Sequence, residues 1–171
     1  NKLYHIKRNA FYGLAKLTTL KLTENPNLSY LDSYAFDGLS MLSSLDLSNK
    51  KIDILEPYVF AGLKMLSTIV SPIVKEIKEN AFYQLNNLFS FSIPTGSNFT
   101  TLNSYSFSNL TRLSNLDLSN QQITYIPSYA FIDLPRLVII HMTKNPIKII
   151  ASFAFCNLNN PQITSISFNY V

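Results

Sequence analysis

The stretch Leu17–Asn25, which reads LTTLKLTEN, contains the pattern that decides the fold. Leu20 and Leu22 alternate with polar residues, which is typical of a short strand with one buried face. A leucine stands three residues before this pair, and an asparagine closes the stretch. The alternating pair recurs along the chain at a regular interval, which indicates a repeat architecture rather than a single closed domain.

Phenylalanine fixes the length of the repeat. Seven phenylalanines follow one another at separations of 25, 24, 22, 25, 24 and 24 residues: Phe11, Phe36, Phe60, Phe82, Phe107, Phe131 and Phe155. Each has a leucine three residues later and an Ile or Leu five residues earlier. One coil of this length cannot bury its own apolar residues, so successive coils must stack and share a core. The seven phenylalanines are therefore expected to stack as a spine near the convex side.

The repeat resembles the class of extracellular leucine-rich repeats about 24 residues long. Toll-type receptors, hormone-type receptor ectodomains and lymphocyte receptors of jawless fish contain this class. The segment Ile126–Leu137, IPSYAFIDLPRL, carries the resemblance, which covers the whole chain. A second resemblance, to BspA-like surface repeats, is carried by Ala154–Leu158 and by the pair Ile93-Pro94. The resemblance implies an α/β repeat, a right-handed solenoid of about seven coils. Its parallel sheet lies on the concave side, and irregular or 3₁₀ segments lie on the convex side.

The closing asparagine is replaced in two coils. Lys50 and Gln121 stand at its position, and Asn49 and Asn120 come one residue earlier. In the family that asparagine satisfies backbone groups inside the turn, and a buried N–H without a partner costs about 1–3 kcal/mol. Either Asn49 and Asn120 reach inward through a shifted turn, or these coils are looser.

The array over residues 1–171 has one irregular place and no recognisable ends. The coil around residues 61–82 is the shortest, and Ser71 and Pro72 interrupt its strand, so a bend is expected there. Neither end carries a capping module, and an uncapped solenoid exposes apolar core to water. We expect the sequence to be the interior of a longer array or an ordered portion of a larger protein.

The sequence contains no pattern for catalysis, a cofactor or a metal. His5 and His141 lie more than five coils apart, and neither a G-x-S-x-G motif nor a glycine-rich phosphate loop occurs. Cys156 is the only cysteine, which excludes an internal disulfide framework and a cysteine-based zinc site. It is expected to pack as a small buried side chain, or alternatively to pair with a cap outside this sequence. The prediction is therefore a binding protein, not an enzyme.

The amino-acid composition restricts the classes of partner that this chain is expected to bind. The 14 Lys and Arg residues are spread without a dense cluster and the net charge is +4, which argues against a nucleic-acid surface. The longest apolar run has four residues, so no segment here is expected to insert into a membrane. A protein partner is predicted, with self-association possible. The resemblance implies an extracellular or cell-surface location, in a receptor or adhesion protein.

The outward residues of the predicted concave strands are small, neutral and rich in hydroxyl groups. Val70, Ile139 and His141 stand out from this background, and Asn115 and Asp117 lie on the neighbouring strand. These five residues are the candidate contact for a polypeptide. The alternative is an ordinary solvated sheet whose partner binds elsewhere.

Aromatic residues recur two positions before the spine: Tyr34, Tyr58, Tyr105, Tyr129 and Phe153. The tyrosines are a candidate lateral strip, since exposed tyrosines suit interfaces. With such a strip the protein would be a structural scaffold or matrix component that assembles sideways. The alternative is that the rings stack on neighbouring coils and shield the spine.

Three sequons for N-glycosylation begin at Asn27, Asn98 and Asn109. Their number is what chance predicts, so it is no evidence for secretion. Asn27 and Asn98 occupy the same repeat position, where the side chain is expected to face solvent and to accept a glycan.

Overall fold

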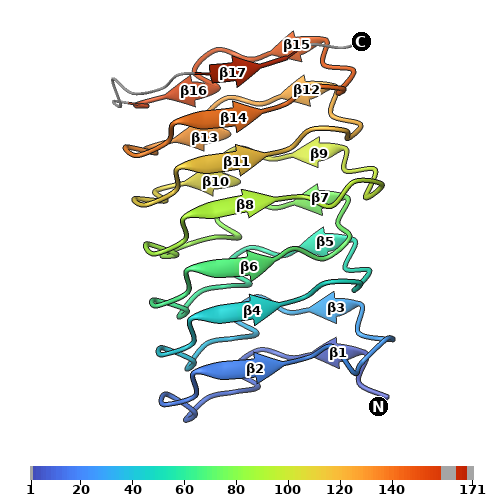
Figure 1. Cartoon of the computed structure of the whole chain (residues 1–171), viewed down its shortest axis with the longest axis vertical. Helices are drawn as coiled ribbons and strands as arrows, with labels where there is room; N and C mark the ends of the chain where they lie inside the picture. The colour runs from blue at the N-terminus through green and yellow to red at the C-terminus, as the bar shows by residue number, and fades with distance from the viewer. Residues whose placement is uncertain (1, 159–164, 169–171) are drawn as a thin grey trace.

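The computed structural model describes residues 2–158 and 165–168. It is a parallel-strand solenoid of about seven coils, which confirms the predicted architecture (Figure 1). The described residues contain no helix, so turns and short strands replace the helical segments that an α/β repeat implies.

Three rows of strands run along the solenoid. The main row has three-residue strands: β2 (Thr19–Lys21), β4 (Ser44–Asp46), β6 (Thr68–Val70), β8 (Ser90–Ser92), β11 (Asn115–Asp117), β14 (Ile139–His141) and β17 (Ser165–Ser167). The second row has two-residue strands: β1 (His5–Ile6), β3 (Tyr30–Leu31), β5 (Ile54–Leu55), β7 (Glu76–Ile77), β9 (Thr101–Leu102), β12 (Tyr125–Ile126) and β15 (Ile149–Ile150). The third row is confined to the later coils: β10 (Phe107–Ser108), β13 (Phe131–Ile132) and β16 (Phe155–Cys156).

The main row holds the alternating pairs of the sequence pattern. On β4, Ser44 is exposed and Leu45 is buried, and the same alternation recurs on β8 and β11. We call the surface made by the outward residues of this row the sheet face; it carries the columns that the sequence analysis assigned to the concave side.

The main row consists of two hydrogen-bonded sheets. Strands β2, β4 and β6 form one, and β8, β11, β14 and β17 form the other. Within the described residues no strand pairing joins β6 to β8. Pro72, just after β6, has no N–H to donate to a neighbouring strand. Beside it, the buried Ser71 hydroxyl donates a hydrogen bond to the Pro72 carbonyl within the same chain segment. The break falls in the shortest coil.

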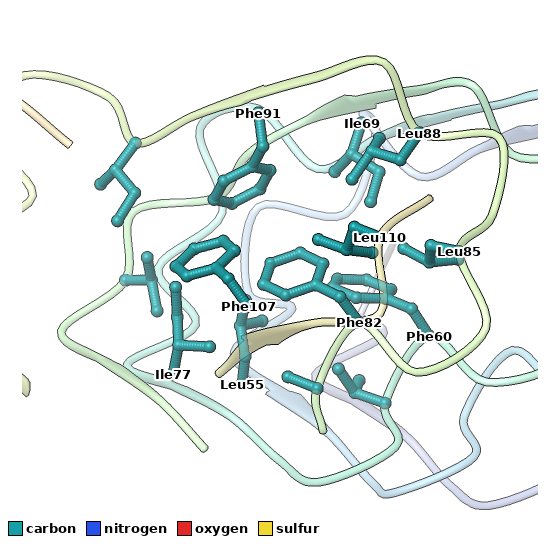
Figure 2. Packing of buried hydrophobic residues seen from close by; sticks show 14 of the residues in the cluster. Leu55, Phe60, Ile69, Ile77, Phe82, Leu85, Leu88, Phe91, Phe107 and Leu110 are labelled. Carbon is teal, nitrogen blue, oxygen red and sulfur yellow. The ribbon is translucent and has the colours of Figure 1, made fainter. Parts of the chain in front are cut away.

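The phenylalanine spine is continuous. Neighbouring rings of the spine lie with centroids 5.1–6.0 Å apart from Phe11 to Phe155, as predicted. Figure 2 shows Phe60, Phe82 and Phe107 in this stack, and Phe91 contacts Phe82 edge-on at 4.8 Å. Because β10, β13 and β16 each contain a spine residue, the spine follows the third row of strands.

The position two residues before each spine phenylalanine adopts a left-handed backbone conformation. Its φ angles lie between 56° and 61° for Asn9, Tyr34, Tyr58, Asn80, Tyr105, Tyr129 and Phe153. The N–H of each of the first six donates to the equivalent carbonyl of the next coil at 2.9–3.1 Å. The left-handed column is therefore a hydrogen-bond ladder that connects all seven coils.

The structure shows which side chains enter the turn in the two coils whose closing asparagine is replaced. Asn49 and Asn120 are exposed and do not reach inward, so the first of the two alternatives, a shifted turn, is wrong. Gln121 is buried, and its amide oxygen accepts from the Phe99 N–H at 3.2 Å. Lys50 is also buried, and its Nζ donates to the Thr23 carbonyl at 2.9 Å. Both residues thus satisfy backbone groups themselves, because their side chains are long enough to enter the turn.

Candidate functional site

The register of the main row brings four of the five predicted contact residues together. Asn115 pairs with Ile139, and Asp117 pairs with His141, on the adjacent strands β11 and β14. Asn115 and His141 are exposed, while Ile139 and Asp117 are partly buried. The four side chains form a square on the sheet face with one apolar, one acidic and two polar corners.

Val70 lies outside this square. It is 43% exposed on β6, in the other hydrogen-bonded sheet, and β8 separates it from β11. Val70 is therefore a separate apolar spot on the sheet face.

A shallow hollow of about 250 Å³ lies beside the square. Its walls come from β6, β8, β11 and β14, and it is lined by Ile69, Ser90, Phe91, Ser92, Asn115, Leu116, Asp117 and His141. Asp117 has a second, structural role, because its Oδ1 accepts hydrogen bonds from both the N–H and the hydroxyl of Ser119. Asp46 and Ser48 repeat this arrangement, and those hydrogen bonds lower the pKa of Asp46.

The aromatic strip is stacked. Tyr34 and Tyr58 form one stack at 5.3 Å, and Tyr105, Tyr129 and Phe153 form a second at 5.7 and 5.9 Å. Its outer rings remain open to solvent, since Phe153 is 65% exposed and Tyr105 is 42% exposed. The stacks are separate because Asn80 replaces tyrosine in the coil between them.

The three sequon asparagines are all exposed. Asn98 and Asn109 also have positive φ angles of 54° and 56°, so both lie at turns. Cys156 is only partly buried on β16, which corrects the expectation of a buried thiol.

Two polar clusters lie along the second row of strands. The His5 Nε2 lies 2.8 Å from Asp32 Oδ1, and this hydrogen bond holds the pKa of Asp32 below its usual value. Burial alone would raise the pKa of Glu76, but hydrogen bonds from Lys78 and Asn103 outweigh it, and the pKa is lowered. In the described part of the chain, no three His, Cys, Asp or Glu side chains are close enough together to hold a metal ion.

A second hollow, of about 560 Å³, was not predicted from the sequence. It lies on the flank that leads into β8, β11 and β14, and it is lined by Ser67, Asn87, Phe89, Arg112, Ser114, Pro135, Arg136 and Val138. Phe89 is 58% exposed there. A sequence signal existed: the residue after the leading leucine is Thr or Ser in four other coils, but it is Phe89 or Val138 here.

No helix among the described residues has the length and apolar character needed to cross a lipid bilayer.

Solved structures show the same fold. Over 90% of this chain, the crystal structure of a TLR13–ssRNA13 complex matches with a TM-score of 0.63 and 23% identity. The complex of Toll with Spatzle from Drosophila matches over 94% of this chain with a TM-score of 0.51 and 16% identity. The chain spans only 22% and 26% of those two proteins. At these identities the likeness establishes the fold alone.

A search of curated proteins finds no match. A family model for the BspA-type leucine-rich-repeat region, however, matches six copies over residues 1–95 and 56–170. These two ranges together include nearly every coil described above. The chain belongs to the BspA-type leucine-rich-repeat family.

Proposed function

We propose that this chain is a protein-recognition module of an extracellular or cell-surface receptor or adhesion protein, and that it is not an enzyme. The observation that carries the proposal is the square of Asn115, Asp117, Ile139 and His141 beside a hollow on the sheet face. Neighbouring parallel strands lie roughly 5 Å apart. One polypeptide segment laid across β11 and β14 therefore contacts all four side chains.

The chemistry of the square suits a polypeptide. Ile139 supplies an apolar contact, while Asn115 and His141 offer hydrogen-bond donors and acceptors. Asp117 keeps one oxygen for Ser119 and presents the rest of its carboxylate toward the hollow. The partner that fits has an apolar side chain next to backbone amides or a cationic group.

Nucleic acid remains a competing partner in the test. The spread of basic residues argued against it, but one structural neighbour is a complex with single-stranded RNA. That neighbour does not support the exclusion of a nucleic-acid partner from the sequence. A labelled single-stranded RNA is therefore tested for binding alongside the peptides.

The proposal is tested by selecting binders from a random dodecapeptide library on the biotinylated protein. We expect the enriched peptides to bind about tenfold more weakly to Ile139→Ser/His141→Ser, because both side chains leave the contact. Thr19→Ser/Lys21→Ser changes the equivalent positions on β2 and serves as the matched control. Peptides that bind all three proteins equally would refute the sheet-face contact.

An extracellular location is tested by expression behind a secretion leader in a eukaryotic cell. Asn27, Asn98 and Asn109 are exposed, so we expect glycans that an amidase removes with a shift in mobility. Asn-to-Gln changes at the three positions should remove the same shift. A secreted protein that carries no glycan at any of them would contradict the expectation.

A second candidate function rests on the aromatic strip. Tyr105 and Phe153 keep exposed rings on the same stack, and such a row offers a lateral contact to a second copy. In that case the protein is a scaffold that assembles sideways. Sedimentation of Tyr105→Ser/Tyr129→Ser against the parent chain separates the candidates, since only the scaffold function predicts a concentration-dependent assembly that these changes abolish.

A further inference from the structure

The flank that leads into the main row carries a strip of unlike side chains in register. Met41, Met65, Asn87, Arg112 and Arg136 each stand three residues before a strand of that row and form one column along the flank; Lys16 holds the same position in the coil before them. Strand pairing keeps the first two in register through β4 and β6, and the last three through β8, β11 and β14, on either side of the break between β6 and β8. Two side-chain hydrogen bonds follow this column: Asn87 Nδ2 donates to the Lys64 carbonyl at 2.8 Å, and Arg112 Nη1 donates to Asn87 Oδ1 at 2.9 Å.

One end of the column is cationic. Arg112 and Arg136 are both exposed and line the same hollow. Neither belongs to an ion pair within the described residues, and no acidic side chain is among the described residues that line the hollow. Two guanidinium groups on adjacent coils thus have unused donors in a fork geometry that matches carboxylates.

Apolar side chains lie beside these arginines and in the coils before them. Phe89, which lines the hollow, is 58% exposed. In the two coils before it, Met65 is 49% exposed and Met41 is 50% exposed. Aromatic residues, methionine and arginine are the residue types enriched in the cores of protein interfaces. A soluble surface normally holds such side chains singly, and here they lie along one flank.

We propose that this strip, made of Met41, Met65, Phe89, Arg112 and Arg136, is the docking site for an extended acidic segment of a protein partner. The segment places two carboxylates on the arginines and apolar side chains on Phe89 and the methionines. The inference rests on the proposed recognition function, but it uses a different surface from the sheet face. Four coil steps of roughly 5 Å make the column about 20 Å long, which matches about six residues of extended chain at roughly 3.3 Å each.

The order of side chains favours a polypeptide over a nucleic acid. A single-stranded nucleic acid carries one charge per nucleotide, and proteins that bind it line the whole track with cations. On this flank Arg112 and Arg136 are followed by Asn87, Met65 and Met41, so three successive coils carry no cation in the column before Lys16. A polypeptide with acidic residues at one end and apolar residues at the other matches that change.

The test uses the same dodecapeptide library, with affinities of synthetic peptides measured by fluorescence anisotropy. We expect a class of enriched peptides that contain an acidic pair next to apolar residues. Their affinity should fall about tenfold or more for Arg112→Glu/Arg136→Glu, because like charges then face each other. Phe89→Ser should weaken the same peptides. Lys51→Glu/Lys148→Glu changes the net charge equally, away from the strip, and should leave them unchanged.

The outcomes separate this inference from the function on which it rests. Peptides that respond only to Ile139→Ser/His141→Ser would overturn the strip and leave the recognition function standing. Peptides that respond to no variant would overturn both. A labelled oligouridine that binds the parent chain and loses binding on arginine reversal, without any such peptide class, would make the strip a nucleic-acid site and overturn the proposal. Thermal unfolding of each variant shows that it folds, and Arg112→Gln/Arg136→Gln replaces the reversal if that variant does not.

Discussion

Substitution of Tyr129 separates the energy of the aromatic stack from the strain of the left-handed column. Tyr129 has φ 59°, and its ring stacks on Tyr105 at 5.7 Å and on Phe153 at 5.9 Å. Its N–H donates to the Phe153 carbonyl, and its carbonyl accepts from Tyr105, so the ladder holds this conformation whichever side chain is present.

Substitution by glycine loses the stabilising ring contacts but relieves the strain of the left-handed backbone. Loss of two ring pairs, each roughly 0.5–1.5 kcal/mol, makes Tyr129→Ala less stable than the parent by about 1–3 kcal/mol. A side chain with a Cβ costs roughly 1–2 kcal/mol in the left-handed conformation, and glycine avoids this cost. Glycine gains about 0.4–1 kcal/mol of extra freedom in the unfolded chain, which offsets part of the relief. Tyr129→Gly should therefore be about 1 kcal/mol more stable than Tyr129→Ala.

Urea unfolding with a common slope gives the difference from the two midpoints. Ser128 is the matched control, because it precedes Tyr129 and does not have a positive φ. There the order should reverse, with Ser128→Gly less stable than Ser128→Ala by about 0.5–1 kcal/mol. If Tyr129→Gly were the less stable of its pair, the left-handed column would not impose strain and the reasoning would fail.

Three further predictions follow from the packing and the charges. Gln121→Ala should lower the free energy of unfolding by about 1–3 kcal/mol, because a backbone N–H of the preceding coil loses its acceptor in the core; urea unfolding measures it. Phe107→Ala should cost about 3–5 kcal/mol and Phe11→Ala clearly less, since Phe11 is only partly buried and has one ring neighbour; equal costs would contradict the spine. The lowered pKa of Glu76 means that its contribution to stability is complete above the unfolded value near 4.5 and is lost as pH falls through the folded pKa. Glu76→Gln, which also removes the ion pair with Lys78, should therefore flatten the acid limb of a stability–pH curve.

The fold was predictable because the repeat places identical residues in columns. Seven phenylalanines at a common spacing specify both the coil length and the neighbour of every ring. The third row of strands was not predictable, since β10, β13 and β16 have only two residues each and show no alternation. The error over Asn49 and Asn120 had another cause. The prediction considered only an asparagine amide as the acceptor for the backbone N–H inside the turn. Gln121, which stands at the position of the closing asparagine, accepts that hydrogen bond instead.

The positions of the candidate residues along the strands were predictable from the sequence, but the hollows that they line were not. Sequence columns placed Ile139 and His141 opposite Asn115 and Asp117, as the strand register has them. The column after the leading leucine singles out Phe89 and Val138, but the hollow that they line is made by side chains from four coils, so no single column shows it. The left-handed conformation of the tyrosine column did leave a signal, because two of the three coils without tyrosine have asparagine there, Asn9 and Asn80. Asparagine is the residue other than glycine that adopts this conformation most readily.

The left-handed backbone also bears on the choice between a stacked strip and a lateral contact. Tyrosine at this position is strained by roughly 1–2 kcal/mol relative to a right-handed conformation, so some interaction must offset the cost. Each coil of the longer stack has such an interaction, since Tyr105, Tyr129 and Phe153 share two ring pairs of roughly 0.5–1.5 kcal/mol each. The shorter stack has extra contacts: Arg8 lies 4.5 Å over the Tyr34 ring, and Tyr83 packs edge-on against Tyr58. Contacts within one chain therefore offset most of the strain, and the strip needs no second copy to account for its aromatic residues. A lateral partner would add to a stack that is already stable, which favours recognition through the sheet face and the flank over assembly through the tyrosines.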